Sequence, residues 1–159
     1  MALWHVDSMW TVKTQPSDDL IVRYGWAATV IAQALLTTLR NARTRARSKQ
    51  IEFSLSYEYL EWLYLKQQGR CYYSDRLMES ERDSDRKTSR SSLILSIDRL
   101  DPDGGYIPGN VCLCCCDVNI AKSDMTAENF IKMCNSVTEA QSLHSRAREG
   151  KSGVKLSKL

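Results

Sequence analysis

The chain has 159 residues, of which 26% are charged and 43% hydrophobic, and its formal net charge at pH 7 is +3. This length and composition fit one ordinary globular domain, with or without helical extensions, and exclude a disordered chain. The net charge is too small to indicate a partner, so any affinity for nucleic acid has to come from where the cations lie.

The start of the chain shows no targeting segment. Met1 is followed by a short mixed stretch without the basic and apolar regions of a secretory signal. The longest apolar run, residues 26–36, contains Gln33 and falls well short of the roughly 20 residues that a membrane-spanning helix needs. We therefore expect an intracellular protein without a membrane segment, in the cytoplasm or with its DNA. The terminal Ser-Lys-Leu matches a peroxisomal address, but so short a match predicts little.

In an intracellular protein the six cysteines are expected to be free thiols or metal ligands.

Residues 1–50 are expected to form an irregular arm followed by one long helix. Ser17 and the two aspartates after it favour a helix start, because the hydroxyl caps free amide groups and acids suit the positive end of a helix. Apolar residues then recur at helical spacing from Leu20 to Leu35, with Gly25 as a weak point. The same helix is expected to continue through the basic run that follows.

That basic run, residues 38–49, contains no acid. Such a run is often the solvated C-terminal end of a helix, where the helix dipole stabilises cationic side chains. In a nucleic-acid-binding protein the same run would contact phosphates, and helical spacing gathers three of the arginines on one side. The candidate phosphate-contacting residues are Arg40, Arg43, Arg47 and Lys49.

A second helix is predicted after a brief extended link. Ser56 is the expected cap, Gln68 the expected last residue, and Gly69 the stop. A polar stretch over residues 79–92 is expected to be a solvated loop. The buried face of this second helix is expected to include Leu60, Leu63 and Tyr64.

The next part of the chain predicts a hairpin. Residues 93–98 alternate between apolar and more polar positions and end in Asp98, which is expected to face away from the leucine side. Turn-forming residues fill positions 101–109, and the alternation resumes over residues 111–115. Two antiparallel strands joined by a long connection are therefore expected.

A short helix fits residues 117–122, and its spacing places Asn119 and Lys122 on one face. Asp98 and Asn119 both carry hard oxygen ligands, which suit Mg²⁺ or Mn²⁺ with several waters retained. Lys122, one turn along from Asn119, would hold a phosphate beside such an ion. The resulting ββα unit has the parts of a small metal site that acts on phosphate.

The residues of this unit also form an ordered set. They are Asp98-Arg99 in the first strand, Gly105-Tyr106 and Pro108-Gly109-Asn110-Val111 in the loop and second strand, and Asn119-x-x-Lys122-Ser123-Asp124 on the helix. As a set they resemble the HNH, or ββα-metal, endonuclease family, over about residues 66–134. The resemblance implies DNA as the partner and a single divalent cation, Mg²⁺ or Mn²⁺, bound by Asp98 and Asn119, with Asn110 bracing the loop.

The chain departs from that family at the position of the general base, where the family has histidine and this chain has Arg99. An arginine stays protonated at any usable pH and cannot accept a proton from water. Asp101 or Asp103 would be a weaker base near the ion, with Arg99 clamping the scissile phosphate. The alternative is that Asp98 and Arg99 form an ordinary ion pair at the end of a strand.

Many members of the family also hold a structural zinc ion with two Cys-x-x-Cys pairs. Only half of each pair is present in this chain, as Cys71 with Ser74 and as Cys115 with Val118. Neither serine nor valine is a normal zinc ligand, so structural Zn²⁺ is not expected and buried thiols are. The alternative is an irregular residual zinc site around Cys71 and Cys115, completed by other cysteines.

Thr126 and Asn129 predict the start of a last helix, which is expected to run to about Ala147 and to be followed by a basic, flexible tail. One apolar cluster is expected to pack this helix onto the ββα unit. Its members are Phe130, Ile131, Met133 and Cys134.

Together these predictions give an α+β fold with a small ββα-metal core, predominantly helical outside the hairpin, in segments 1–50, 51–135 and 136–159. The leading function is metal-dependent cleavage of DNA. One rival is an HNH-fold nucleic-acid-binding protein with impaired catalysis, since losing a general base costs about 10²–10⁴-fold in rate. The other is a structural subunit of a larger particle, and a homodimer also remains open. The candidate catalytic residues are Asp98, Arg99, Asn110, Asn119 and Lys122.

Overall fold

The structure is a computed structural model that describes residues 15–80 and 93–152. Most of the predicted N-terminal arm, most of the predicted polar loop and the end of the basic tail with its Ser-Lys-Leu lie outside these described residues.

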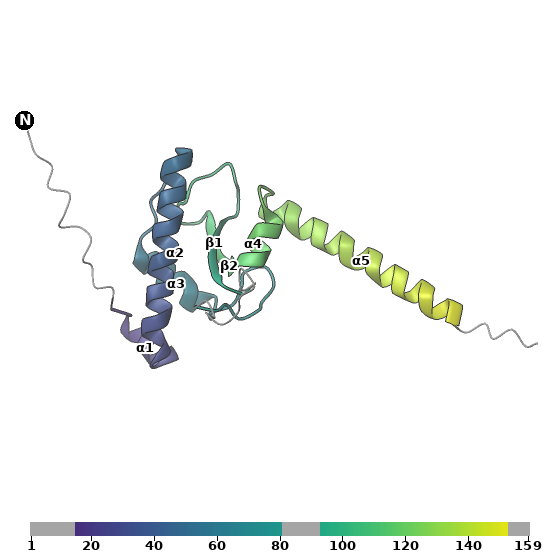
Figure 1. The fold of residues 1–159 in the computed structure, drawn as a ribbon, viewed down its shortest axis with the longest axis horizontal. Helices are drawn as coiled ribbons and strands as arrows, with labels where there is room; N and C mark the ends of the chain where they lie inside the picture. The colour runs from purple at the N-terminus through teal and green to yellow at the C-terminus, as the bar shows by residue number, and fades with distance from the viewer. Residues whose placement is uncertain (1–14, 81–92, 153–159) are drawn as a thin grey trace, which may run out of the picture.

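A two-stranded antiparallel sheet lies at the centre, with α2 and α3 against one face and α4 against the other (Figure 1). The predicted α+β class is confirmed, and so is the helical character outside the hairpin. Among the described helices, none has the length and apolar character needed to cross a membrane. In chain order the elements are α1 (Asp18–Tyr24), α2 (Ala27–Lys49), α3 (Tyr57–Lys66), β1 (Leu95–Arg99), β2 (Val111–Cys115), α4 (Cys116–Lys122) and α5 (Ala127–Ser152).

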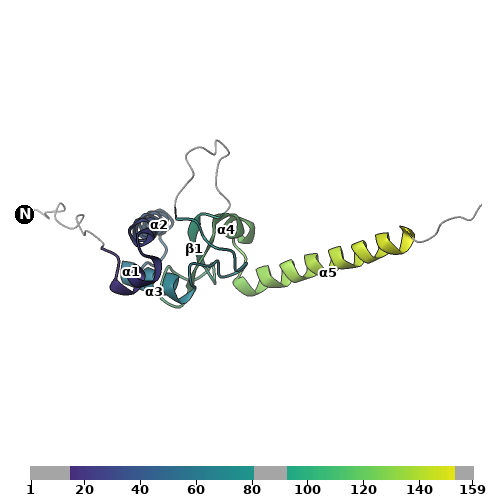
Figure 2. The same cartoon turned by 90° about the horizontal axis from the view of Figure 1, so that it is seen from below.

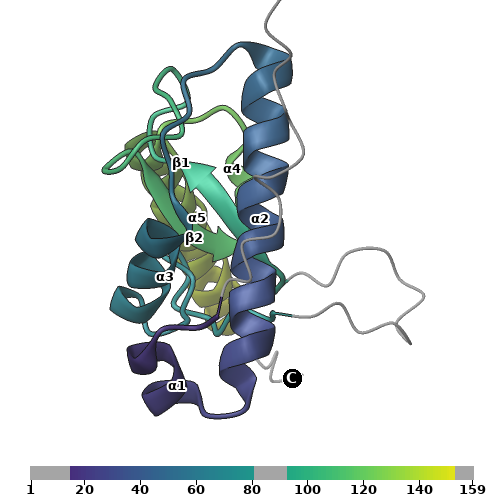
Figure 3. The ribbon, with the colours of Figure 1, turned by 90° about the vertical axis from the view of Figure 1, so that its left-hand side faces the viewer.

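The N-terminal helix begins where the sequence predicts, but it does not continue as one helix. Ser17 accepts a hydrogen bond from the backbone N–H of Leu20 at 3.2 Å, which is the expected cap. Gly25 then breaks the helix with φ +56° and ψ −129°, a conformation that glycine reaches more easily than other residues. The prediction of a single helix is therefore wrong, and α1 folds back at one end of α2 (Figure 3).

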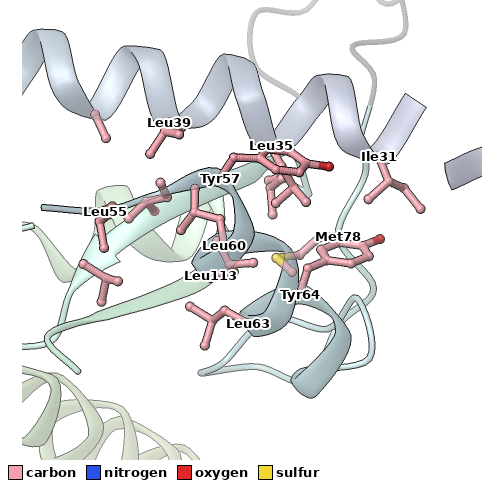
Figure 4. Close-up of a cluster of buried hydrophobic side chains, with 14 of the residues drawn as sticks. Ile31, Leu35, Leu39, Leu55, Tyr57, Leu60, Leu63, Tyr64, Met78 and Leu113 are labelled. Carbon is pink, nitrogen blue, oxygen red and sulfur yellow. The ribbon is translucent and has the colours of Figure 1, made fainter. Parts of the chain in front are cut away.

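The core is formed between α2, α3 and the sheet. Leu35 of α2, Leu60 of α3 and Leu113 of β2 have no exposed surface and meet at its centre (Figure 4). Small residues Ala42 and Ala46 continue the buried side of α2 toward its C-terminal end. This packing fixes which sides of α2 are left to face the hairpin and the solvent.

The turn after α3 depends on Gly69. α3 ends at Lys66, two residues before the predicted end, and Gly69 takes φ +70° and donates its backbone N–H to the carbonyl of Tyr64 at 3.0 Å. A Cβ atom at this position would lie 2.9 Å from the hydroxyl oxygen of Tyr64. The predicted cap is confirmed, because Ser56 accepts from the N–H of Tyr59 at 3.2 Å.

We expect Gly69→Ala to destabilise the protein more than Gly109→Ala by about 1–3 kcal/mol, the usual effect of forcing an extra carbon into a packed site. Both glycines have positive φ, so both variants share the backbone cost, but a Cβ at Gly109 meets no atom within 4 Å. Urea denaturation of the two variants measures the difference. Equal unfolding free energies would contradict a close Gly69–Tyr64 contact.

The last helix is longer than predicted and less packed. α5 extends away from the rest of the chain (Figures 1 and 2). Phe130 is buried, but Ile131 is 45% and Met133 42% exposed, and Cys134 is also exposed. The prediction that all these residues pack on the ββα unit is correct for Phe130 and wrong for the others.

Candidate functional site

The hairpin and α4 build the candidate site. β1 pairs with β2 so that Ile97 lies opposite Leu113 and Asp98 opposite Cys112. Because neighbouring side chains on a strand point to opposite faces, Ile97 enters the core beneath α2 and α3, whereas Asp98 faces α4. The alternation in the sequence predicts this division.

Asp98 is buried, with only 5% of its surface exposed, and its charge is balanced by Lys122. The Lys122 ammonium lies 3.2 Å from each carboxylate oxygen and also donates to the carbonyl of Arg99 at 2.9 Å. Lys122 itself has no exposed surface. The structure therefore places this lysine behind the site as the partner of Asp98, with none of its surface exposed to a phosphate.

Tyr73 adds a second donor to the same carboxylate. Its hydroxyl lies 2.7 Å from Oδ2 of Asp98. Burial, the neighbouring Cys112 thiol and the hydrogen bond to Asp98 together raise the pKa of Tyr73 well above its ordinary value. Tyr73 therefore remains a hydroxyl donor to Asp98 at any physiological pH.

Asn119 is held against β1 by its amide nitrogen. Nδ2 donates to Oγ of Ser96 at 2.7 Å and to the carbonyl of Ile97 at 3.1 Å. These bonds hold the amide group against the strand beside Ile97, which is the neighbour of Asp98. They leave the carbonyl oxygen of Asn119 as the atom that can meet a ligand.

Arg99 stabilises the loop after β1. Its Nη1 donates to the carbonyls of Pro102 at 2.6 Å and Gly104 at 2.8 Å, and its guanidinium lies 5.2 Å from the ring centroid of Tyr106. The alternative of an Asp98–Arg99 ion pair is wrong, because the ionic partner of Asp98 is Lys122.

Asn110 contacts the loop from the other side. Its Oδ1 accepts from the N–H of Asp101 at 3.0 Å, and its Nδ2 donates to the carbonyls of Asp101 at 3.1 Å and Gly105 at 2.9 Å. These bonds connect the start of β2 to the end of β1 across the long turn. They are the contacts expected of a residue that braces the loop.

An open cavity of about 360 Å³ gathers side chains from α2, β1 and α4. Asp98, Arg99 and Asn119 line it, as the sequence predicts for one site, whereas Asn110 and Lys122 are not among its lining residues. The other lining residues are Arg45, Lys49, Ser96, Ile97, Tyr106, Cys116, Ile120, Ser123 and Asp124.

The cations around this cavity are only partly those predicted. Lys49 lines it, but Arg40, Arg43 and Arg47 line a different surface pocket on another side of α2. Arg45 takes their place, with its Nε 3.5 Å from the hydroxyl of Tyr106. The signal for this was the spacing of Arg45 and Lys49, four residues apart and therefore on one side of the helix.

Cationic side chains outnumber acidic ones around this cavity. Arg45, Lys49 and Arg99 supply its cations, while the lining acids are Asp98, whose charge Lys122 offsets, and Asp124. Cations around a concave surface attract and orient phosphate groups. Asp124 is exposed; it is the last residue of the motif Asn119-x-x-Lys122-Ser123-Asp124, but it was not among the predicted site residues.

The oxygen atoms at this site are of the chemical type that binds a hard divalent cation, but the carboxylate among them is already engaged in hydrogen bonds. The carboxylate of Asp98 and the amide carbonyl of Asn119 are ligands of the kind that Mg²⁺ and Mn²⁺ prefer. The carboxylate of Asp98, however, already accepts hydrogen bonds from Lys122 and Tyr73. Across the described residues, no three His, Cys, Asp or Glu side chains are grouped as metal ligands.

The half-complete cysteine pairs lie together on the opposite side of β2. Cys71 and Cys115 are both buried, and hydrogen bonds connect Cys71 to Ser74 and to Cys115. Burial, together with the adjacent Cys71, raises the pKa of the Cys115 thiol to about 12. Burial also opposes ionisation of Cys71, but hydrogen bonds from Ser74 and the backbone outweigh it and lower the Cys71 pKa.

We expect the double variant Ser74→Cys/Val118→Cys to gain a zinc site, because it completes a four-thiolate set around Cys71 and Cys115. Zinc at a hundredfold excess over its dissociation constant would then stabilise the variant by about 2.7 kcal/mol. Thermal unfolding with and without Zn²⁺ measures this, with the single variants as controls. A double variant that is indifferent to Zn²⁺ would mean that these positions do not converge.

Comparison with known proteins gives little further information. An uncharacterized protein of Acanthamoeba polyphaga mimivirus is 33% identical over 94 residues, which is 59% of this chain. The chain spans only 15% of the length of that relative. No family model matches the chain, and no solved structure matches it.

Proposed function

We propose that the protein hydrolyses phosphodiester bonds in DNA, using a divalent cation held by Asp98 and Asn119. The observation that carries the proposal is that a strand-end carboxylate and a helix amide line the same cavity as Arg45 and Lys49. This combination supplies ligands for a cation and binding groups for the phosphate that the cation would act on. The family resemblance of the ββα unit points to the same chemistry.

The protein side chains have separate tasks in this proposal. Arg45 and Lys49 bind and orient the phosphate, and Ser96 keeps the amide of Asn119 in position. When bound, the cation stabilises negative charge on the scissile phosphate and the departing oxygen. Arg99 cannot take a proton, so Asp124, whose exposed carboxylate lines the cavity, is the proposed acceptor of the proton of the attacking water.

Lys122 sets a condition on this activity. A cation at Asp98 competes with the Lys122 ammonium for the same carboxylate oxygens. We therefore expect weak cation binding, and expect Mn²⁺ to support cleavage at lower concentrations than Mg²⁺ because it binds such sites more tightly.

A second candidate function is nucleic-acid binding without cleavage. The specific observation in its favour is that Asp98 is already neutralised by Lys122 while Arg99 is engaged by the loop carbonyls. In that case Arg45 and Lys49 would still hold phosphates, and a steep dependence of affinity on salt would follow.

The test is nicking of supercoiled plasmid in Mn²⁺ by wild type, Asn119→Ala and Arg99→His. Cleavage by wild type that Asn119→Ala abolishes supports the nuclease. Cleavage by Arg99→His alone identifies an inactive descendant of a nuclease, and salt-dependent binding without cleavage by any variant identifies the binding protein. Thermal unfolding of each variant controls for folding, since Arg99 also holds the loop.

A further inference from the structure

One row of polar side chains runs along α2 beside the hairpin. Its members recur at every fourth position, so they form one continuous ridge that winds obliquely along the helix, and all of them are exposed. At about 1.5 Å per residue, the row is roughly 24 Å long. It consists of Gln33, Thr37, Asn41, Arg45 and Lys49.

The row connects two cavities. Its N-terminal members line a cavity of about 620 Å³ between α2 and β1, and its C-terminal members line the 360 Å³ candidate site. Arg45, Ser96 and Cys116 line both cavities, which makes them parts of one groove. Figure 3 shows α2 lying alongside β1, as this groove requires.

The chemistry of the row changes along its length. Arg45 and Lys49, next to the candidate site, are cations, whereas Gln33 and Asn41, farther away, are neutral amides. α2 contains no acid that would repel a phosphate chain. This order suits a nucleic-acid strand that is contacted through its phosphates at the cationic end of the row and through its bases at the amide end.

The two amides are free for such a ligand. The hydroxyl of Thr37 donates to the backbone carbonyl of Gln33 at 2.9 Å and is therefore engaged within the helix. The side-chain amides of Gln33 and Asn41, in contrast, make no hydrogen bond to another described residue. An exposed Asn or Gln side chain can form a bidentate pair with the N6 and N7 atoms of adenine.

We propose that this row on α2 is the sequence-reading surface of the protein: Gln33 and Asn41 recognise adenine bases to one side of the scissile phosphate, while Arg45 and Lys49 hold the intervening backbone. The inference rests on the proposed nucleic-acid function and adds the groups that select the sequence. It makes the preferred substrate one with adenine at fixed positions on a single side of the bound phosphate.

The experiment is selection of preferred sequences from random duplex and single-stranded DNA libraries in EDTA, followed by anisotropy titrations of the full chain. The variant is Gln33→Ala/Asn41→Ala. Its matched control is Asn135→Ala/Gln141→Ala, which makes the same chemical changes at exposed positions on α5. A third variant, Lys49→Ala, removes a phosphate contact only.

Wild type is expected to select adenine at fixed positions, and the Gln33→Ala/Asn41→Ala variant to lose that preference and about tenfold in affinity for each amide. The α5 control should behave as wild type, and Lys49→Ala should weaken all sequences alike and lower the salt dependence by about one ion. Wild-type binding without preference, or a preference that survives in the amide variant, would overturn the inference and leave the proposed function standing. If wild type binds neither library, both fail.

Discussion

Lys122→Met is expected to lower the free energy of unfolding by about 3–5 kcal/mol, the usual cost of leaving one partner of a buried ion pair alone. Lys122 has no exposed surface, and its ammonium lies 3.2 Å from both oxygens of Asp98. Without it, the Asp98 carboxylate keeps, among the described residues, only the hydroxyl of Tyr73 as a side-chain donor. Urea denaturation followed by tryptophan fluorescence measures the loss.

The double variant Asp98→Asn/Lys122→Met is the control for this prediction. It removes both charges at once, so most of the lost stability should return, as neutral groups often replace a buried ion pair without net cost. If this double variant folds but does not cleave DNA, the loss of activity comes from the changed site and not from unfolding. A Lys122→Met variant as stable as wild type would show that the pair is open to water.

Asn119→Ala is expected to reduce DNA cleavage by about 100-fold or more, because the variant would lose a ligand of the cation, and the charge stabilisation that such a cation supplies is worth several kcal/mol. The carbonyl oxygen of Asn119 is the proposed cation ligand, and its nitrogen is held by Ser96 and Ile97. Initial rates of plasmid nicking in Mn²⁺ measure the effect.

Two variants separate this effect from a loss of structure. Asn135→Ala makes the same substitution at an exposed position of α5 and should leave the rate unchanged. Asn119→Asp keeps an oxygen at the ligand position and should retain more activity than Asn119→Ala. Equal rates for Asn119→Ala and wild type would remove Asn119 from the metal site.

The local parts of this fold follow from the sequence. Ser17 and Ser56 cap the helices they precede, and the alternation around Asp98 correctly separates its face from that of Ile97. These features depend on neighbouring residues only, and the physical rules for capping and strand alternation are local. The hairpin and the short helix after it were predictable for the same reason.

The partners of charged groups were harder to predict. Asp98 has Arg99 beside it in the sequence, yet its partner is Lys122, 24 residues away, because α4 brings that lysine under the strand. Arg99 points instead toward the carbonyls of the loop. The charge pattern on α2 was equally ambiguous, since the packing of the helix, and not its sequence, decides that Arg45 faces the site while Arg40 does not.

Cleavage of supercoiled plasmid by the wild-type chain during a Mn²⁺ titration tests the central claim most directly. The proposed site predicts nicked product that rises with Mn²⁺, saturates, and disappears when EDTA is added. Plasmid that is bound by the protein, as seen by a gel shift, yet stays supercoiled at every Mn²⁺ and Mg²⁺ concentration would contradict the claim.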